Sequence, residues 1–212
     1  MTMPTLARRL RSRPIPFERW TDRAVTATDE DLAGWPVDTY RARIPSDELR
    51  DGADAAFGRV GEAILALRLF PENAITLAAD STHGRAAVGA TVLQRVTFGP
   101  FALESAVRLT ALETSDDTDR ETVSLTWATL DGHPERGIET FSATRGPDGS
   151  IILTIRARSR PGTRLVRLGT PFARWLQRRY SRAALAHLAA IARGQPLEGV
   201  SERSRPRRDG RR

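Results

Sequence analysis

Three ionisable side chains that could do proton chemistry lie close together at His133, Glu135 and Glu139. A histidine beside a carboxylate can take up and release a proton near neutral pH, so His133 and Glu139 could act as general acid and base. A structural interpretation is also open, because Asp131-Gly132 and Gly137 are typical of turns and either glutamate could accept backbone hydrogen bonds or pair with an arginine. The sequence favours this structural interpretation.

Thiol and metal chemistry have little support in the sequence. The chain contains no cysteine, which excludes disulfides, thiol nucleophiles and thiolate metal ligands. A zinc site needs three or four ligands, and the other two histidines, His83 and His187, belong to separate predicted elements. We therefore expect no metal and no cofactor.

A row of arginines forms the second candidate site. Arg156, Arg158 and Arg160 alternate with Ala157 and Ser159, so the three guanidinium groups leave one face of a predicted strand. They could form an anion-binding platform. The alternative, which the sequence favours, is an outer sheet face that pairs with acidic residues of neighbouring strands.

The charge distribution argues against a nucleic-acid protein. All 33 basic residues are arginines, against 26 acids, for a net charge of +7. Residues 1–13 and 201–212 each contribute +4, which leaves −1 for the body of the chain. The absence of lysine suggests the coding bias of a GC-rich bacterium. Because aromatic residues are not interleaved with the basic segments, binding of nucleic acid or of acidic partners ranks last among our hypotheses.

The pattern along the chain predicts one strand, one helix, six strands and a long final helix. Tyr40, Ala42 and Ile44 alternate as in a half-buried strand, and residues 53–67 have helical spacing that Pro71 ends. Six alternating runs follow, which we expect to form an antiparallel meander. They centre on residues 75–79, 88–92, 103–111, 123–127, 139–143 and 151–157, and turns are expected at 98–100, 114–120, 131–132 and 146–149.

The last helix is the best-defined element. Thr170 can cap it, Pro171 suits its first position, and Gly194 with Pro196 can end it. Its apolar stripe cannot be buried alone, so we expect this helix to lie across the concave face of a twisted sheet. Aromatic and aliphatic residues on the strands and this helix would then face one another around a core or a cavity: Trp127, Phe141, Leu153, Phe172, Leu176 and Tyr180.

This element order resembles the helix-grip architecture of the START, polyketide-cyclase and birch-pollen-allergen superfamily. Two stretches sharpen the resemblance: residues 128–141 are similar to the pattern G-T-L-P-G-H-P-E-x-G-E-E-x-F, and Ser159-Arg160-Pro161 followed by Gln177 and Arg179-Tyr180 is similar to a closing segment. Both patterns belong to the bacterial and plant family known as domain of unknown function nineteen-ninety. This chain departs from the first pattern at Ala128, where glycine is usual, and at Ile138, where the first of two adjacent glutamates is usual.

The resemblance implies an α+β helix-grip fold, in which a curved antiparallel sheet of about seven strands wraps around a long C-terminal helix. We expect an irregular N-terminal arm at 1–36, a helix-grip domain at 37–195 and an arginine-rich disordered tail at 196–212. No targeting segment or apolar run long enough for a membrane span is visible, so we expect a soluble cytoplasmic protein.

Two functional hypotheses follow from a cavity in such a fold. The first is binding of a small apolar or amphipathic molecule between the sheet and the C-terminal helix. The second is an enzyme of the cyclase, isomerase or hydrolase type that uses His133 and Glu139 in the same cavity. The sequence does not indicate the oligomeric state.

Overall fold

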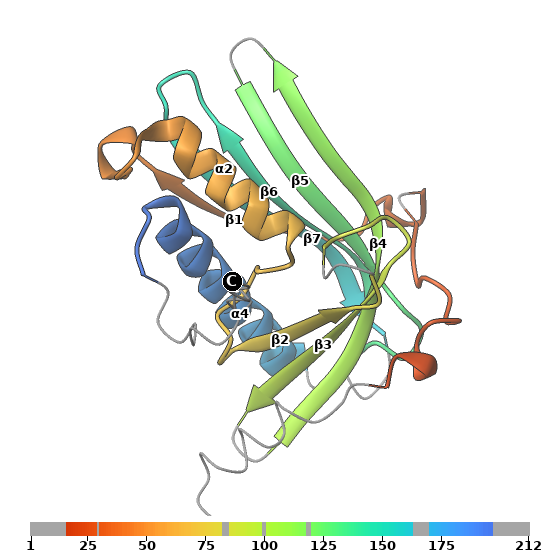
Figure 1. The fold of residues 1–212 in the computed structure, drawn as a ribbon. Coiled ribbons are helices and arrows are strands. Elements are labelled where there is room, and N and C mark those ends of the chain that lie inside the picture. Colours follow the sequence, from red (N-terminus) through yellow and green to blue (C-terminus); the bar gives the residue numbers. More distant parts are fainter. Residues whose placement is uncertain are drawn as a thin grey trace, which may run out of the picture.

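A seven-stranded antiparallel sheet forms the frame of the molecule (Figure 1). The computed structural model describes residues 16–28, 30–81, 85–98, 101–117, 120–162 and 170–196. The strands are β1 (Val37–Ile44), β2 (Ile75–Ala79), β3 (Thr91–Phe98), β4 (Phe101–Asp117), β5 (Arg120–Thr129), β6 (Glu135–Arg145) and β7 (Ile151–Pro161). Their order across the sheet is β1-β7-β6-β5-β4-β3-β2, so a meander of six strands is extended by β1 beside β7.

Two α-helices lie on the same side of this sheet, inside its curve (Figure 1). They are α2 (Gly52–Leu65) and α4 (Thr170–Ala192), and α4 contacts β1, β7 and α2. Short 3-10 helices are η1 (Phe17–Arg19), η2 (Glu30–Leu32) and η3 (Ser46–Glu48). The predicted helix-grip fold is therefore confirmed. Within the described residues, no helix is long and apolar enough to cross a membrane.

The main core fills the space between the concave face of the sheet and the two helices. Side chains with at most 1% exposure come from every layer: Ile64, Leu109, Leu125, Phe141, Ile151, Leu153 and Leu188. A bulge in β4 between Leu109 and Ala111 shifts its register with β5. Such a bulge bends a strand and increases its twist, which helps the sheet curve around the helices.

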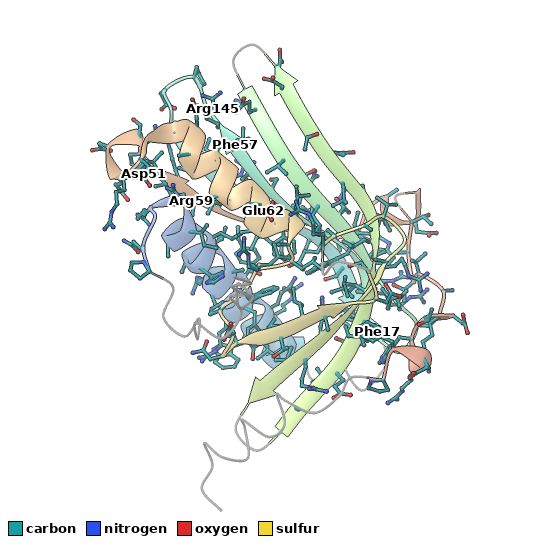
Figure 2. All side chains as sticks on the ribbon, in the orientation of Figure 1. Phe17, Asp51, Phe57, Arg59, Glu62 and Arg145 are labelled. Carbon is teal, nitrogen blue, oxygen red and sulfur yellow. The ribbon has the colours of Figure 1, made fainter. Side chains whose placement is uncertain are left out.

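The described part of the N-terminal segment packs on the convex face of the sheet. Trp20 is 3% exposed and packs with Leu93 and Ala106, whose neighbours Val92 and Val107 belong to the main core on the other face. Figure 2 shows the labelled Phe17 on the side of β4 away from α2. The segment therefore covers part of the sheet that both helices leave bare.

Two local predictions were wrong. The strand expected around 88–92 begins at Thr91, because Gly89 has a φ of +89° and the Ala90 amide donates to the Ala87 carbonyl in a turn. The turn expected at 114–120 is mostly strand, since β4 reaches Asp117 and pairs there with Arg120. Polar residues can continue a ladder beyond the core because both faces are solvated there.

Candidate ligand cavity

A cavity of about 360 Å³ lies at one end of the sheet, between the strands and α4. Its apolar wall consists mainly of Phe70, Ile75, Val96, Leu103, Phe141 and Leu176. Polar lining groups include those of Gln94, Ser105, Trp127, Thr129, Gln177, Tyr180 and Ser181. The three residues of the sequence cluster, His133, Glu135 and Glu139, line the same cavity.

Gly137 brings the two glutamates to the cavity. Its φ of +152° is a conformation that residues with a side chain rarely adopt, and a Cβ there would lie 2.0 Å from the Arg158 carbonyl oxygen. The Gly137 amide donates to Thr129 Oγ1 at 3.0 Å, and Thr129 Oγ1 donates back to the Gly137 carbonyl at 3.2 Å. Because residue 137 has no side chain, the backbone of β6 can approach Arg158 of β7 closely at this point, between Glu135 and Glu139.

Glu139 is the most perturbed acid at the cavity. Its neighbour on β5 is Trp127, whose Nε1–H donates to Glu139 Oε2 at 3.2 Å. Burial is the main cause that raises the Glu139 pKa from 4.5 to about 7, and the charge of Glu135 acts in the same direction. The hydrogen bond from Trp127 favours the ionised form and lowers the pKa. Both protonation states are therefore accessible near neutral pH.

His133 and Glu135 are held together through the backbone. His133 Nδ1 lies 3.0 Å from both the amide nitrogen and the carbonyl oxygen of Glu135. Burial lowers the His133 pKa from 6.5 to about 4, so this imidazole is neutral at neutral pH. Burial also raises the Glu135 pKa, which a hydrogen bond with Ser159 partly offsets.

The other residues proposed from the sequence lie in different places. Trp127, Phe141, Leu176 and Tyr180 line the cavity. Leu153 does not, because it pairs with Ala42 and Ala143 further along β7, in the filled core. The side chain of Phe172, like His83, lies outside the described residues.

The arginine row lies on the convex face of the sheet and does not line the cavity. Arg156 and Arg160 are exposed, and the Arg160 guanidinium stacks 4.1 Å from the centre of the Trp35 ring. Neither Arg156 nor Arg158 forms an ion pair within the described part of the chain, so the expected pairing with acids of neighbouring strands is absent there.

The described residues contain no group of three or more potential metal ligands. His187 is half-buried on α4, where burial is the main cause that lowers its pKa.

Sequence reasoning missed the residues that β3 and β4 contribute. Gln94 and Ser105 form a cross-strand pair whose side chains approach to 3.4 Å. A usable signal exists, because Gln94 lies between Val92 and Val96 on the apolar face of β3. A polar residue on such a face often marks a cavity or a buried hydrogen bond.

Solved structures that match this chain come from several organisms. A hypothetical protein from Helicobacter pylori has a TM-score of 0.51 at 11% identity, with 80% of this chain and 96% of that chain covered. Norcoclaurine synthase from Thalictrum flavum, solved in complex with dopamine and hydroxybenzaldehyde, has a TM-score of 0.42 at 13% identity, with 90% and 100% covered. Major latex-like protein 151 from Panax ginseng has a TM-score of 0.42 at 11% identity, with 76% and 97% covered.

At these identities the similarity concerns the fold alone. No curated protein matches the chain significantly. The family model of the domain of unknown function DUF1990 matches residues 21–187, which is most of the chain. The chain therefore belongs to the DUF1990 family.

Proposed function

We propose that this protein binds a small, largely apolar molecule in the cavity between the sheet and α4. The observation that supports the proposal is the cavity itself, whose volume of about 360 Å³ and mostly apolar lining with a few polar groups are typical of small-molecule sites.

The aromatic side chains of the cavity wall pack against one another. Phe141 packs edge-on against Trp127 and Phe70, with ring centres 4.9 Å and 5.8 Å apart. Such contacts fix the rings before a ligand arrives, so little side-chain freedom is lost on binding. The polar groups around Glu139 then orient the ligand's own polar atoms.

A fluorescent dye tests this proposal directly. N-phenyl-naphthylamine is uncharged, and its fluorescence increases in apolar surroundings. We expect saturable binding by the wild type and a gain in melting temperature, by mass action on the native state. Ala157→Leu, which places a larger side chain at the cavity wall, should weaken dye binding at least about tenfold, or about 1.4 kcal/mol.

Ala143→Leu is the matched control, because Ala143 is fully buried in the filled core and does not line the cavity. This variant should lose stability through overpacking, by about 1–3 kcal/mol, and keep its affinity for the dye. Absence of saturable binding by the wild type, or equal affinity of Ala157→Leu and wild type, contradicts the proposal.

An enzyme that uses the same cavity is the second candidate. The observation that favours it is a carboxyl group with a pKa of about 7 and a neutral imidazole on one cavity wall. Molecules retained by gently purified protein can be identified by mass spectrometry and then added in excess. Conversion by the wild type that Glu139→Gln abolishes supports catalysis, and recovery of every molecule unchanged contradicts it.

A further inference from the structure

We infer that the cavity selects an amphipathic amine, that is, an apolar body with a positively charged nitrogen, and discriminates against carboxylates, sulfates and phosphates. This inference rests on the proposed binding function and assigns the chemical class of its ligand. It follows from which charged groups line the cavity and which are kept away from it.

The ionisable groups that line the cavity are two acids, a histidine and a tyrosine. They are Glu135, Glu139, His133 and Tyr180, and within the part of the chain that the structure describes no arginine lines the cavity, although the sequence contains 33. Arginine is the side chain best suited to hold a carboxylate or a phosphate. Among the described residues, an anion in this cavity would therefore meet two carboxyl groups and no lining arginine.

Several arginines are close in sequence to the lining residues of β7 and α4, but their side chains lie on the faces of these elements that point away from the cavity. On β7 the cavity is lined by Ala157 and Ser159, while the alternating Arg156, Arg158 and Arg160 are on the opposite face. On α4 the lining residues are Leu176, Gln177, Tyr180 and Ser181, and the arginines of the same turns are exposed: Arg174, Arg178, Arg179 and Arg182.

Glu139 has a free acceptor for such a nitrogen. Its Oε2 accepts the hydrogen bond from Trp127, and within the described residues no hydrogen bond reaches Oε1. A protonated amine has donors and no acceptor, which matches a carboxylate oxygen at the end of an apolar cavity. Within the described part of the chain, no ion pair with Glu139 is formed. The amine would supply the positive charge that this partly buried carboxylate lacks.

Binding of the amine should release a proton. Burial and the charge of Glu135 raise the pKa of Glu139 to about 7, so near neutral pH a large fraction of this carboxyl is protonated. A nearby cation stabilises the carboxylate and lowers its pKa again. The proton then leaves Glu139 for the buffer, while the amine keeps its own proton.

Three probes with one apolar body test the inference: naphthylethylamine, naphthylethanol and naphthylacetic acid. Titration calorimetry near neutral pH, repeated in two buffers with different ionisation enthalpies, gives both the affinity and the number of protons released. We expect the amine to bind at least about tenfold more tightly than the acid, with the alcohol between them. Proton release is expected for the amine and not for the alcohol.

Glu139→Gln keeps the shape of the side chain and removes the carboxylate at this position. We expect this variant to lose both the preference for the amine over the acid and the proton release. Glu113→Gln is the control, because Glu113 is an exposed residue of β4 that does not line the cavity. It should leave all three affinities unchanged.

The outcomes separate the inference from the proposed function. If the acid binds as tightly as the amine, or if Glu139→Gln keeps the preference for the amine, the inference is overturned while the binding function stands. If the uncharged dye binds and none of the three probes does, the inference is again overturned. Failure of the dye and of all three probes overturns both.

Discussion

At the scale of single residues, burial acts on Glu139 and His133 in opposite directions. It makes the acid weaker, with a pKa of about 7, and the base weaker, with a pKa of about 4. In both residues the neutral form is favoured because a charge is poorly solvated inside the molecule. Between these two pKa values the neutral forms of both Glu139 and His133 therefore predominate.

These shifts predict how stability depends on pH. Folded Glu139 keeps a proton that the unfolded chain loses above its ordinary pKa of 4.5, so its effect on stability becomes unfavourable as pH rises through 4.5 to about 7. His133 takes up a proton below pH 6.5 in the unfolded chain, but only below about pH 4 in the folded chain. Stability is therefore lost as pH falls from 6.5 to about 4. The two effects largely cancel in the wild type.

Single variants should separate the two effects. Glu139→Gln should leave the histidine effect, so that stability rises with pH between about 4 and 6.5. His133→Asn should leave the glutamate effect, so that stability falls between 4.5 and about 7, by up to about 3 kcal/mol. Urea unfolding across this pH range measures both slopes, and profiles parallel to the wild type for both variants would contradict the prediction.

The sequence placed the titratable cluster on one hairpin and could not show that it borders a cavity. The sequence identified His133 and Glu139 as candidates and indicated the acid–base chemistry that they could perform. Their burial depends on β3, β4 and α4, which are far away in the chain. The hydrogen bond between Trp127 and Glu139 follows from the register of β5 and β6, which local patterns do not determine.

At the scale of elements, the strongest predictions came from features that act locally. The helix α4 begins at Thr170, close to the predicted start, and Gly194, whose φ is +66°, lies just after its end. Alternation correctly indicated most strands. The pairing of β1 with β7 joins residues more than a hundred positions apart, and alternation alone carries no information about such a partner.

The two helices are joined by one side chain of α2 that caps α4. Arg59 donates from Nε to the Ile191 carbonyl at 3.2 Å and from Nη2 to the Ala192 carbonyl at 2.9 Å, and from Nη1 to Asp51 Oδ2 at 3.0 Å. Figure 2 shows Asp51 and Arg59 beside the C-terminal end of α4. The carbonyls at a helix end have no partners within the helix, and a cation there also suits the helix dipole.

Arg59→Leu should therefore loosen the last turn of α4. We expect a loss of about 1–3 kcal/mol in unfolding free energy, because carbonyls that are partly buried lose charged donors. Hydrogen exchange should become faster in the last turn of α4 and remain unchanged in β5. Arg43→Leu is the matched control, since its pair with Asp148 is more than half exposed, and it should have a smaller effect. Equal losses in the two variants would contradict the capping role.

At the scale of the whole molecule, the sheet has a different partner on each face. The helices and the cavity lie on the concave face, and the N-terminal segment covers part of the convex face (Figure 1). The family model begins at residue 21, so it includes much of this segment. This segment also contacts β6 at Thr26, whose Oγ1 accepts a hydrogen bond from the Gly137 amide at 3.3 Å.

Removing the anchor of this segment should destabilise the entire fold. Trp20 is 3% exposed on the convex face, and its replacement by alanine should lower the unfolding free energy by about 3–5 kcal/mol. Trp175, which is 50% exposed on α4, gives a control with the same residue type, and Trp175→Ala should cost less than about 1 kcal/mol. Urea unfolding followed by circular dichroism compares the two variants. If Trp20→Ala unfolds at the wild-type urea midpoint, the packing of Trp20 contributes no stability to the sheet. The N-terminal segment would then not stabilise the hydrogen bond between Thr26 and the Gly137 amide beside the cavity.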